Sequence, residues 1–249
     1  MRPFLAAVAF LTRLPVGRIA AFDPVDVARS AGWFPVIGIL LGAIYTAAAA
    51  LLRAHLPLDL VAILLVILDA LATGCLHFDG LADTADGFGG GKDPEDVLRI
   101  MRDHSIGSYG AIAIVSAVAL KLTAYSALLK QSDWMAAMIL TPCLGRWSIL
   151  LLSATLPYAR TSPSVIQGMG KRSLFWGTGA TLAAMIGARS ARTWIAAAAV
   201  LAVSAAFGFY CRRRISGITG DTLGANLELS ESAALLAFVW TAPFVWTAQ

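Results

Sequence analysis

The sequence predicts an all-α protein, a polytopic helical bundle embedded in a membrane. Of its 249 residues, 58% are hydrophobic and only 14% are charged. Soluble globular proteins have about 45–50% apolar and roughly 25% charged residues. In addition, the apolar residues fall into stretches of about 20, the length of a helix that crosses a bilayer. This composition excludes disordered proteins, coiled coils, disulfide-stapled secreted domains and most soluble enzymes.

We expect one transmembrane catalytic domain over residues 1–249, with about seven spanning helices. Residues 1–15 hold a short apolar run followed by Arg13 and Pro15, where a cleaved signal peptide would need small residues. They are therefore interpreted as a retained segment at the membrane interface. The predicted spans are residues 31–52, 56–76, 108–129, 133–156, 174–188, 193–210 and 232–248. The main polar stretches are residues 77–108, 157–173 and 211–231.

The basic residues predict the orientation of the bundle, because cytoplasmic loops carry an excess of Lys and Arg. With the N-terminus inside, thirteen of the 19 basic residues fall on the cytoplasmic side and four fall outside. The other two, Lys121 and Arg146, lie within spans. All three polar stretches are therefore expected on the cytoplasmic face. The net charge of +4 is attributed to the basic residues that set this orientation, and it does not indicate a nucleic-acid partner.

Three aspartates in the stretch 77–108 form a helical pattern. Asp79, Asp83 and Asp86 are spaced i, i+4, i+7, which places them on one stripe of a helix. Like charges at this spacing destabilise a helix unless a cation lies between them, and carboxylate oxygens suit Mg²⁺ or Mn²⁺. The alternative is a solvated acidic face, but such faces mix Glu with Lys and this stripe contains only Asp. The sequence therefore predicts a metal site.

The residues around this stripe have several candidate roles. His77 opens the motif, with a role at the helix start, in packing or in catalysis. The glycine-rich residues 87–91 are interpreted as a flexible stretch that ends the helix. Residues 94–102 are expected to form a short amphipathic helix with Pro94 at its start.

A second polar cluster, residues 212–231, combines three arginines with glycines, hydroxyl groups and carboxylates. The arginines are typical of cytoplasmic anchors. Thr219 and Thr222, with the neighbouring glycines, suit a phosphate that bridges to a metal. Asp221, with Glu228 as the weaker candidate, is predicted to complete the metal site. The alternative is that Asp221 caps the helix that follows.

Three ionisable residues lie inside predicted spans: Asp69, Lys121 and Arg146. Such groups are costly in lipid and generally have paired or functional roles. Counted along their helices, Asp69 and Arg146 lie at similar depths from the same face. A buried Asp69–Arg146 pair and two residues that each face a polar cavity are the open alternatives.

The chain resembles the cobalamin synthase family in motifs that follow the family's order along nearly its whole length. The matching segments are residues 10–15, 29–30 with 33–42, 77–87, 101–110, 142 with 145–146, 157–160 and 219–225. The motif at 77–87 is highly specific. At one position the chain departs from the pattern, because the family often has a basic residue where Ser105 stands.

The resemblance implies the last assembly step of cobalamin. The phosphocobinamide group of adenosylcobinamide-GDP would pass to the 5′-hydroxyl of α-ribazole, or of its 5′-phosphate, with release of GMP. It also implies a multi-pass enzyme of the bacterial inner membrane with Mg²⁺ as cofactor. A second copy of the chain and other enzymes of cobalamin synthesis are the further candidate partners.

Together, the motifs and the resemblance predict the site residues. The catalytic candidates are Asp83, Asp86 and His77. The candidates for binding substrate or phosphate are Arg13, Arg102, Arg146, Arg160, Thr219 and Thr222. The metal-ligand candidates are Asp79, Asp83, Asp86, Asp221 and Glu228.

Two other functions share part of this pattern. A CDP-alcohol-type lipid phosphotransferase shares the start of its motif with Asp83-x-x-Asp86-Gly87, but its Ala-Arg pair and its downstream aspartates are missing here. An ion-coupled transporter would use Asp69, Lys121 and Arg146 near the midplane. The polar residues gather instead at one face, which favours phosphoryl chemistry. Release of GMP with and without EDTA separates these functions.

Overall fold

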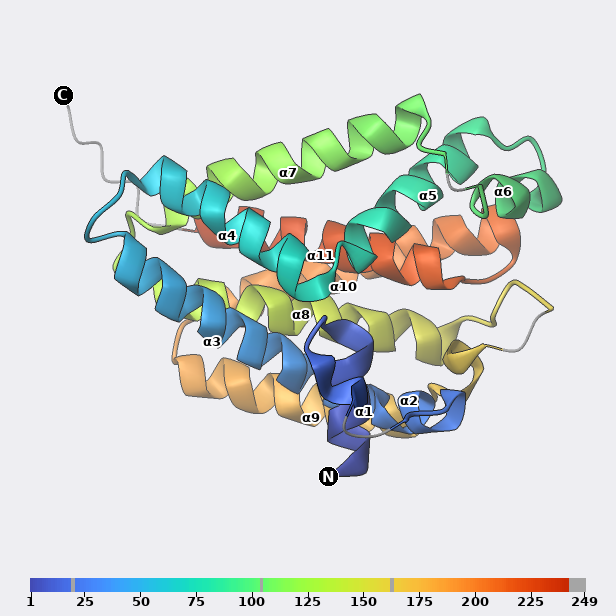
Figure 1. Ribbon diagram of the computed structural model, residues 1–249, viewed down its shortest axis with the longest axis horizontal. Coiled ribbons are helices and arrows are strands. Elements are labelled where there is room, and N and C mark those ends of the chain that lie inside the picture. The colour runs from blue at the N-terminus through green and yellow to red at the C-terminus, as the bar shows by residue number, and fades with distance from the viewer. Residues whose placement is uncertain (19–20, 104, 162–163, 242–249) are drawn as a thin grey trace.

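The computed structural model describes residues 1–18, 21–103, 105–161 and 164–241 (Figure 1). Within these ranges the regular elements are all helices, and the one β contact is an isolated bridge between Tyr158 and Ile218. The all-α prediction is confirmed. The α-helices are α1 (Arg2–Leu11), α2 (Pro24–Ser30), α3 (Phe34–Leu52), α4 (Leu58–Thr73), α5 (Leu76–Gly90), α6 (Pro94–Ile100), α7 (Ser108–Leu128), α8 (Trp134–Thr155), α9 (Lys171–Ala188), α10 (Arg192–Ile215) and α11 (Gly220–Trp240). Short 3₁₀ turns occupy Pro15–Arg18, Ala31–Trp33 and Val165–Gly168.

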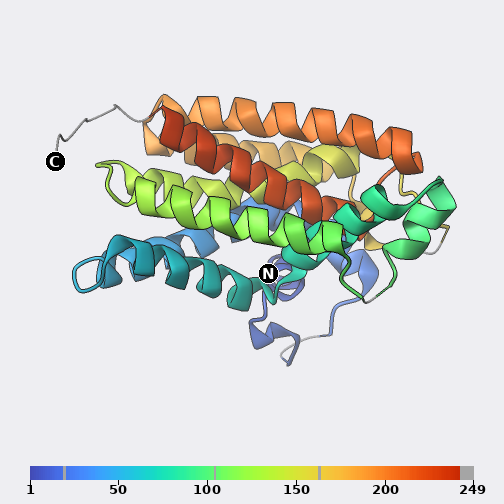
Figure 2. The ribbon, with the colours of Figure 1, turned by 90° about the horizontal axis from the view of Figure 1, so that it is seen from above.

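The long helices lie side by side along the longest axis of the molecule (Figures 1 and 2). Four helical runs are long and apolar enough to cross a membrane, and α4 with α5 would make a fifth if this bent pair counts as one span. A helical membrane protein is thus confirmed, but the count of seven is not. The four runs are Pro24–Leu52, Ser108–Leu128, Trp134–Thr155 and Arg192–Ile215.

The two remaining predicted spans correspond to α9 and α11, which are less apolar than the others. Helix α9 begins with Lys171 and Arg172, and α11 carries Asn226, Glu228 and Glu231. Residues 242–248 of the last predicted span lie outside the described residues. The segment 220–231 is also helical, which corrects the expectation of a loop over 211–231. It forms a helix because the polar side chains of this segment are buried against partners on other helices.

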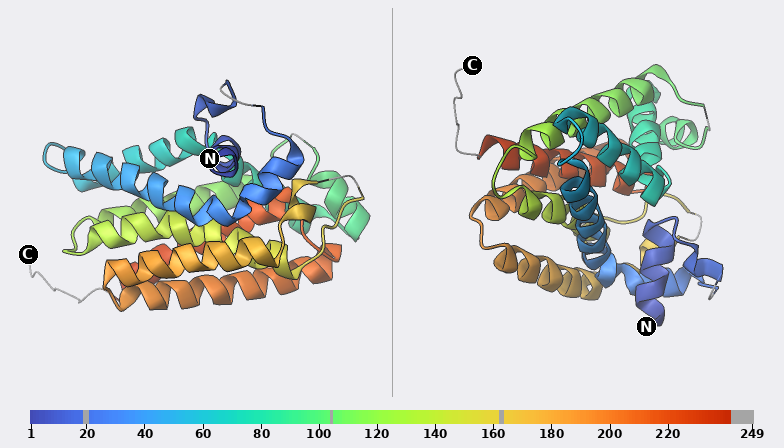
Figure 3. Two further views of the ribbon diagram at one scale, coloured as in Figure 1. Left: turned by 90° about the horizontal axis from the view of Figure 1, so that it is seen from below. Right: turned by 60° about the vertical axis from the view of Figure 1, so that its left-hand side comes forward.

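Helix α1 runs across the direction of the long helices, as Figure 1 and the left view of Figure 3 show. Its Ala6, Ala7 and Leu11 are fully buried against the bundle. A short apolar helix in this direction suits the predicted interfacial segment, which stays a prediction because its depth in a membrane is not tested.

The second predicted span ends earlier than expected, because the chain turns by 90° between α4 and α5. Gly74 has a φ of 64° and forms the C-cap of α4, a left-handed conformation that glycine adopts without strain. Cys75 follows with a φ of 60°, which is uncommon for a residue with a side chain. This bend turns the acidic helix α5 out of line with α4.

The three polar stretches meet at one end of the bundle, which we call the polar end. It comprises α6, residues 156–161 and 164–170, and the turn 216–219, on the right in Figure 1. Tyr158 pairs with Ile218, and the Arg214 guanidinium donates hydrogen bonds of 2.8 Å to the carbonyls of Phe88 and Gly91. Residues from all three predicted polar stretches, 77–108, 157–173 and 211–231, thus meet at this end, whereas Glu228 and Glu231 of the last stretch lie deeper in the bundle. Which side of the membrane this end occupies is not tested.

Candidate active site

The acidic motif is helical, as its spacing predicts. Asp79, Asp83 and Asp86 all lie on α5; Asp79 is exposed and the other two are half-buried. The predicted end of the helix at the glycine-rich stretch is confirmed, because α5 ends at Gly90; residues 87–90 themselves are helical and not a separate flexible segment. This part of α5 packs closely against α6, because a Cβ atom at Gly87 would meet Met101, the C-cap of α6, and the carbonyl oxygen of Val97.

Asp86 is held by the start of α7. Its two carboxylate oxygens accept hydrogen bonds from the backbone N–H groups of Gly107, at 2.8 Å, and Gly110, at 2.9 Å. Negative charge is favourable at a helix N-terminus. A Cβ atom at either glycine would collide with this carboxylate, so a side chain at either position would displace Asp86 from its two donors. Asp86 therefore joins α5 to α7, whatever else it binds.

The metal prediction assumed that the three aspartates converge on one point. The structure does not bring them together in this way. Within the described ranges, the group of acidic side chains whose oxygen atoms lie within 4.8 Å of one another is Asp69, Glu228 and Glu231 instead. The reason is geometric: positions i and i+7 are about 10 Å apart along a helix axis. In addition, Asp86 points to α7. A metal at this motif needs ligands from outside α5.

Asp221 is the acidic side chain that α11 brings to α5. Gly80 and Gly224 allow close backbone contact: a Cβ atom at Gly80 would lie 2.7 Å from the carbonyl oxygen of Asp221. Burial raises the pKa of Asp221, Arg160 opposes this shift, and the nearby negative charge of Asp79 adds to it. The two polar clusters that the sequence predicts are thus adjacent in the structure.

Two neighbouring threonines, and not Asp221, form the cap at the start of α11. Thr219 is the N-cap of α11, and Thr219 and Thr222 each accept a hydrogen bond from the other's backbone N–H in a capping box. Asp221 instead accepts hydrogen bonds from Arg160 at 2.8 Å and from Thr219 at 3.3 Å. Both threonines are fully buried, and their hydroxyl groups form the hydrogen bonds of the cap.

The other predicted residues are distributed around this centre. His77 is buried at the start of α5, and its Nε2 has no hydrogen-bond partner among the described residues. Its backbone contacts Gly224, which favours the packing role. Arg13 lies against Gly74 at the bend that leads into α5. Arg102 is exposed just after α6 at the polar end.

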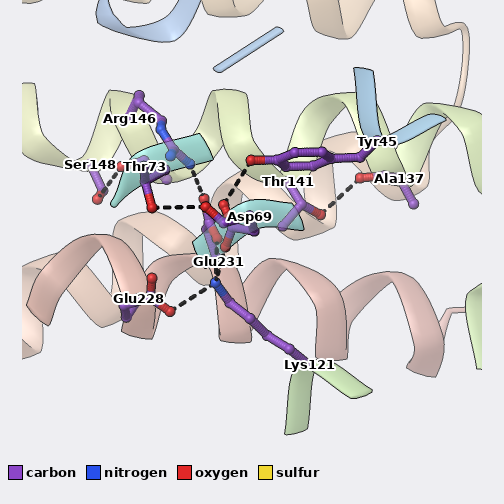
Figure 4. A network of polar contacts seen from close by, with 11 residues as sticks. Tyr45, Asp69, Thr73, Lys121, Ala137, Thr141, Arg146, Ser148, Glu228 and Glu231 are labelled. Carbon is purple, nitrogen blue, oxygen red and sulfur yellow. Dashed lines mark hydrogen bonds and ion pairs between the residues drawn. The ribbon is translucent and has the colours of Figure 1, made fainter. Parts of the chain in front are cut away.

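A buried charge network lies deeper in the bundle (Figure 4). The Lys121 ammonium lies 3.1 Å from Asp69 and 2.8 Å from both Glu228 and Glu231. Arg146 forms its ion pair with Glu231, and Tyr45 donates a hydrogen bond of 2.8 Å to Asp69. These six side chains come from α3, α4, α7, α8 and α11, and three carboxylates face two cations.

This network changes three assignments. Glu228 and Arg146 belong to it, so the structure does not bring them to the acidic end of α5. The ion-pair partner of Asp69 is Lys121, not Arg146. Glu231 and Tyr45 were missed in the sequence, although Glu231 follows Glu228 by three residues and therefore lies on the same helix face.

Comparison with known proteins identifies the family. Residues 3–239 match the model of a family described as cobalamin-5-phosphate synthase. The chain belongs to this family. Its relatives include proteins named adenosylcobinamide-GDP ribazoletransferase from Syntrophobacter fumaroxidans, with 35% identity, from Ralstonia nicotianae, with 38%, and from Rhizobium etli, with 40%. The three alignments cover 93–96% of this chain and 94–96% of each relative.

The extent of the match shows that both polar clusters and the buried network lie within the cobalamin-5-phosphate synthase family region. No solved structure was found to match the chain.

Proposed function

We propose that the chain is an adenosylcobinamide-GDP ribazoletransferase that acts in the late steps of cobalamin synthesis. The observation that carries this proposal is the near full-length similarity to enzymes of that name. The polar end supports it, because acidic and basic groups from three distant stretches meet there. That arrangement suits a substrate that carries a pyrophosphate.

The reaction exchanges one phosphate ester for another. The 5′-hydroxyl oxygen of α-ribazole, or of its 5′-phosphate, forms a bond to the phosphorus that carries cobinamide. The bond between that phosphorus and the oxygen of GMP breaks, and the hydroxyl proton leaves. We assign acceptance of this proton to Asp83, a carboxylate of the acidic stripe on α5 that is partly accessible.

Arg160 is the residue best placed to bind the phosphate groups. One guanidinium nitrogen donates to Asp221, while its Nε is buried without a partner among the described residues. A guanidinium offers several N–H donors in a fixed plane, so one group can contact a carboxylate and a phosphate together. The carboxylate of Asp221 thereby orients Arg160 toward the donor substrate.

The donor set also fits Mg²⁺. This ion commonly binds one or two carboxylates together with substrate phosphates and water, and needs no cage of protein ligands. Asp79 and Asp83 from α5 and Asp221 from α11 would hold it, and all three are at least partly accessible. When bound, Mg²⁺ would neutralise charge on the pyrophosphate and on the departing GMP.

Measurement of GMP release tests the proposal. Purified full-length protein in nanodiscs should release GMP from adenosylcobinamide-GDP only when α-ribazole or its phosphate is present, and EDTA should stop the release. Asp83→Asn should lower its rate by orders of magnitude and leave a small residual rate. The matched control is Asp93→Asn, because Asp93 accepts a hydrogen bond from the Asp96 N–H at the start of α6 and asparagine keeps that oxygen. GMP release that needs no acceptor and continues in the presence of EDTA would refute the assignment.

A further inference from the structure

A cavity separate from the candidate active site opens between α3, the 3₁₀ turn Ala31–Trp33 and α9. Its volume is about 1030 Å³, which is at the upper end of the range for small-molecule pockets. Trp33, Val36, Trp176 and Ala180 form apolar walls, and Gly32 and Gly179 leave space between the helices. None of the predicted catalytic, phosphate or metal residues lines it.

The mouth of this cavity is basic. Arg29 at the end of α2 and Lys171 and Arg172 at the start of α9 line it, and all three are exposed. In the described part of the chain, none of the three forms an ion pair. The lining includes no acidic residue. The mouth therefore offers three exposed positive charges; Asp26, which acts on Arg29 at longer range, pairs with Arg2 and does not line the cavity.

The two ends of the cavity differ in chemical character. Its basic residues lie near the polar end, whereas Gly179 and Ala180 lie about 13 Å farther along α9, at 1.5 Å per residue. Trp33 and Trp176 are exposed beside it, and tryptophan is enriched where a membrane meets water. The site thus presents cations at one end and an apolar channel at the other.

We propose that this cavity binds an anionic phospholipid of the surrounding membrane. The phosphate headgroup contacts Arg29, Lys171 and Arg172, and an acyl chain lies along α9 beside Trp176 and Ala180. Charge complementarity at the mouth selects an anionic lipid, and the apolar wall holds its chain. A water-soluble phosphate meets only the first of these two requirements.

Native mass spectrometry of the full-length protein tests this site. Protein exchanged from detergent into mixed phosphatidylglycerol and phosphatidylcholine micelles should retain one phosphatidylglycerol molecule more strongly than phosphatidylcholine. The triple variant Arg29→Gln, Lys171→Gln, Arg172→Gln should lose about a hundredfold in affinity, given the usual contribution of a basic residue near an anionic lipid. The matched control changes Lys92, Arg212 and Arg213 to Gln, since these are exposed basic residues at the same polar end, and it should retain the lipid.

A second variant tests the apolar part of the site without a change of charge. A Cβ atom at Gly179 meets nothing within 4 Å, so Gly179→Phe should fold, fill the cavity and displace the lipid. If Gly179→Phe retains phosphatidylglycerol, or if the triple variant and its control lose the lipid equally, the proposal is wrong. Displacement of the lipid by glycerol 3-phosphate alone would show a free-phosphate site and would also overturn it.

Discussion

At the scale of single residues, the cap of α11 and the negative charge at its start belong to different side chains. The first turn of α11 is capped by Thr219 and Thr222, whereas the Asp221 carboxylate faces Arg160 and lies near Asp79. The sequence suggested both roles for this segment but could not assign them. Capping depends on the local φ and ψ angles of Thr219, which residue types alone leave open.

We therefore expect Asp221→Asn to lower turnover by orders of magnitude and to raise the Mg²⁺ concentration needed for half activity. Its melting temperature should stay near that of the wild type, because the cap remains. Thr219→Ala is the comparison: it removes the cap and the 3.3 Å hydrogen bond to Asp221 but keeps the Asp221 charge, so it should cost about 1 kcal/mol of stability and spare most of the Mg²⁺ dependence. Normal turnover in Asp221→Asn would exclude Asp221 from the site.

The buried network predicts a different kind of defect. Lys121 is fully buried and lies within 3.1 Å of three carboxylates. Removing one partner of a buried ion pair typically costs 3–5 kcal/mol, because the remaining charge is left uncompensated. Lys121→Met should lower the stability measured by denaturation in detergent by about this amount, whereas Lys130→Met, at an exposed lysine, should not.

The double variant Lys121→Met, Glu228→Gln checks the cause. If the excess negative charge is what destabilises the single variant, neutralising Glu228 should restore part of the lost stability. A double variant that is no more stable than Lys121→Met would assign the loss to packing instead.

At the scale of elements, the contact between α5 and α11 is what makes the site composite. Small residues allow membrane helices to approach closely, and Gly80 and Gly224 lie at this contact. The spacing of the aspartates predicted the helix α5 and its acidic stripe. It could not show that α5 turns by 90° from α4, since this bend depends on the left-handed conformations of Gly74 and Cys75.

The same substitution at two glycines of α5 tests this contact. Gly80→Ala places a Cβ atom 2.7 Å from the Asp221 carbonyl oxygen, so the helices must separate; overpacking of this kind costs about 1–3 kcal/mol. We expect a large loss of turnover. Gly90→Ala, whose Cβ atom would lie 3.5 Å from Ile100, should be close to wild type. Equal activity of the two variants would contradict a site that spans α5 and α11.

At the scale of the whole molecule, the bundle has a polar end and an opposite end that carries the loops 53–57, 129–133 and 189–191 (Figure 3). The distribution of Lys and Arg predicted which loops share a face, and residues from the three polar stretches do meet at the polar end, although Glu228 and Glu231 lie deeper in the bundle. The helix count was harder to predict, because the sequence does not show that α11 buries its carboxylates against Lys121.

We expect the polar end to face the cytoplasm, because it holds most of the basic residues. In a background in which the exposed Cys75 is replaced by serine, an impermeant thiol reagent added to intact cells should miss Lys92→Cys and Ser216→Cys and label Lys130→Cys. Labelling of Lys92→Cys from outside would reverse the orientation.

The most direct test of the composite site is a double-mutant cycle on GMP release. The steady-state kcat/KM for adenosylcobinamide-GDP is measured for Asp83→Asn, Asp221→Asn and the double variant. Residues that act as a unit show strongly non-additive effects. If α5 and α11 form one phosphoryl-transfer site, the double variant should be about as active as the weaker single variant. Losses that multiply in the double variant would contradict the composite site and place Asp83 and Asp221 in independent roles.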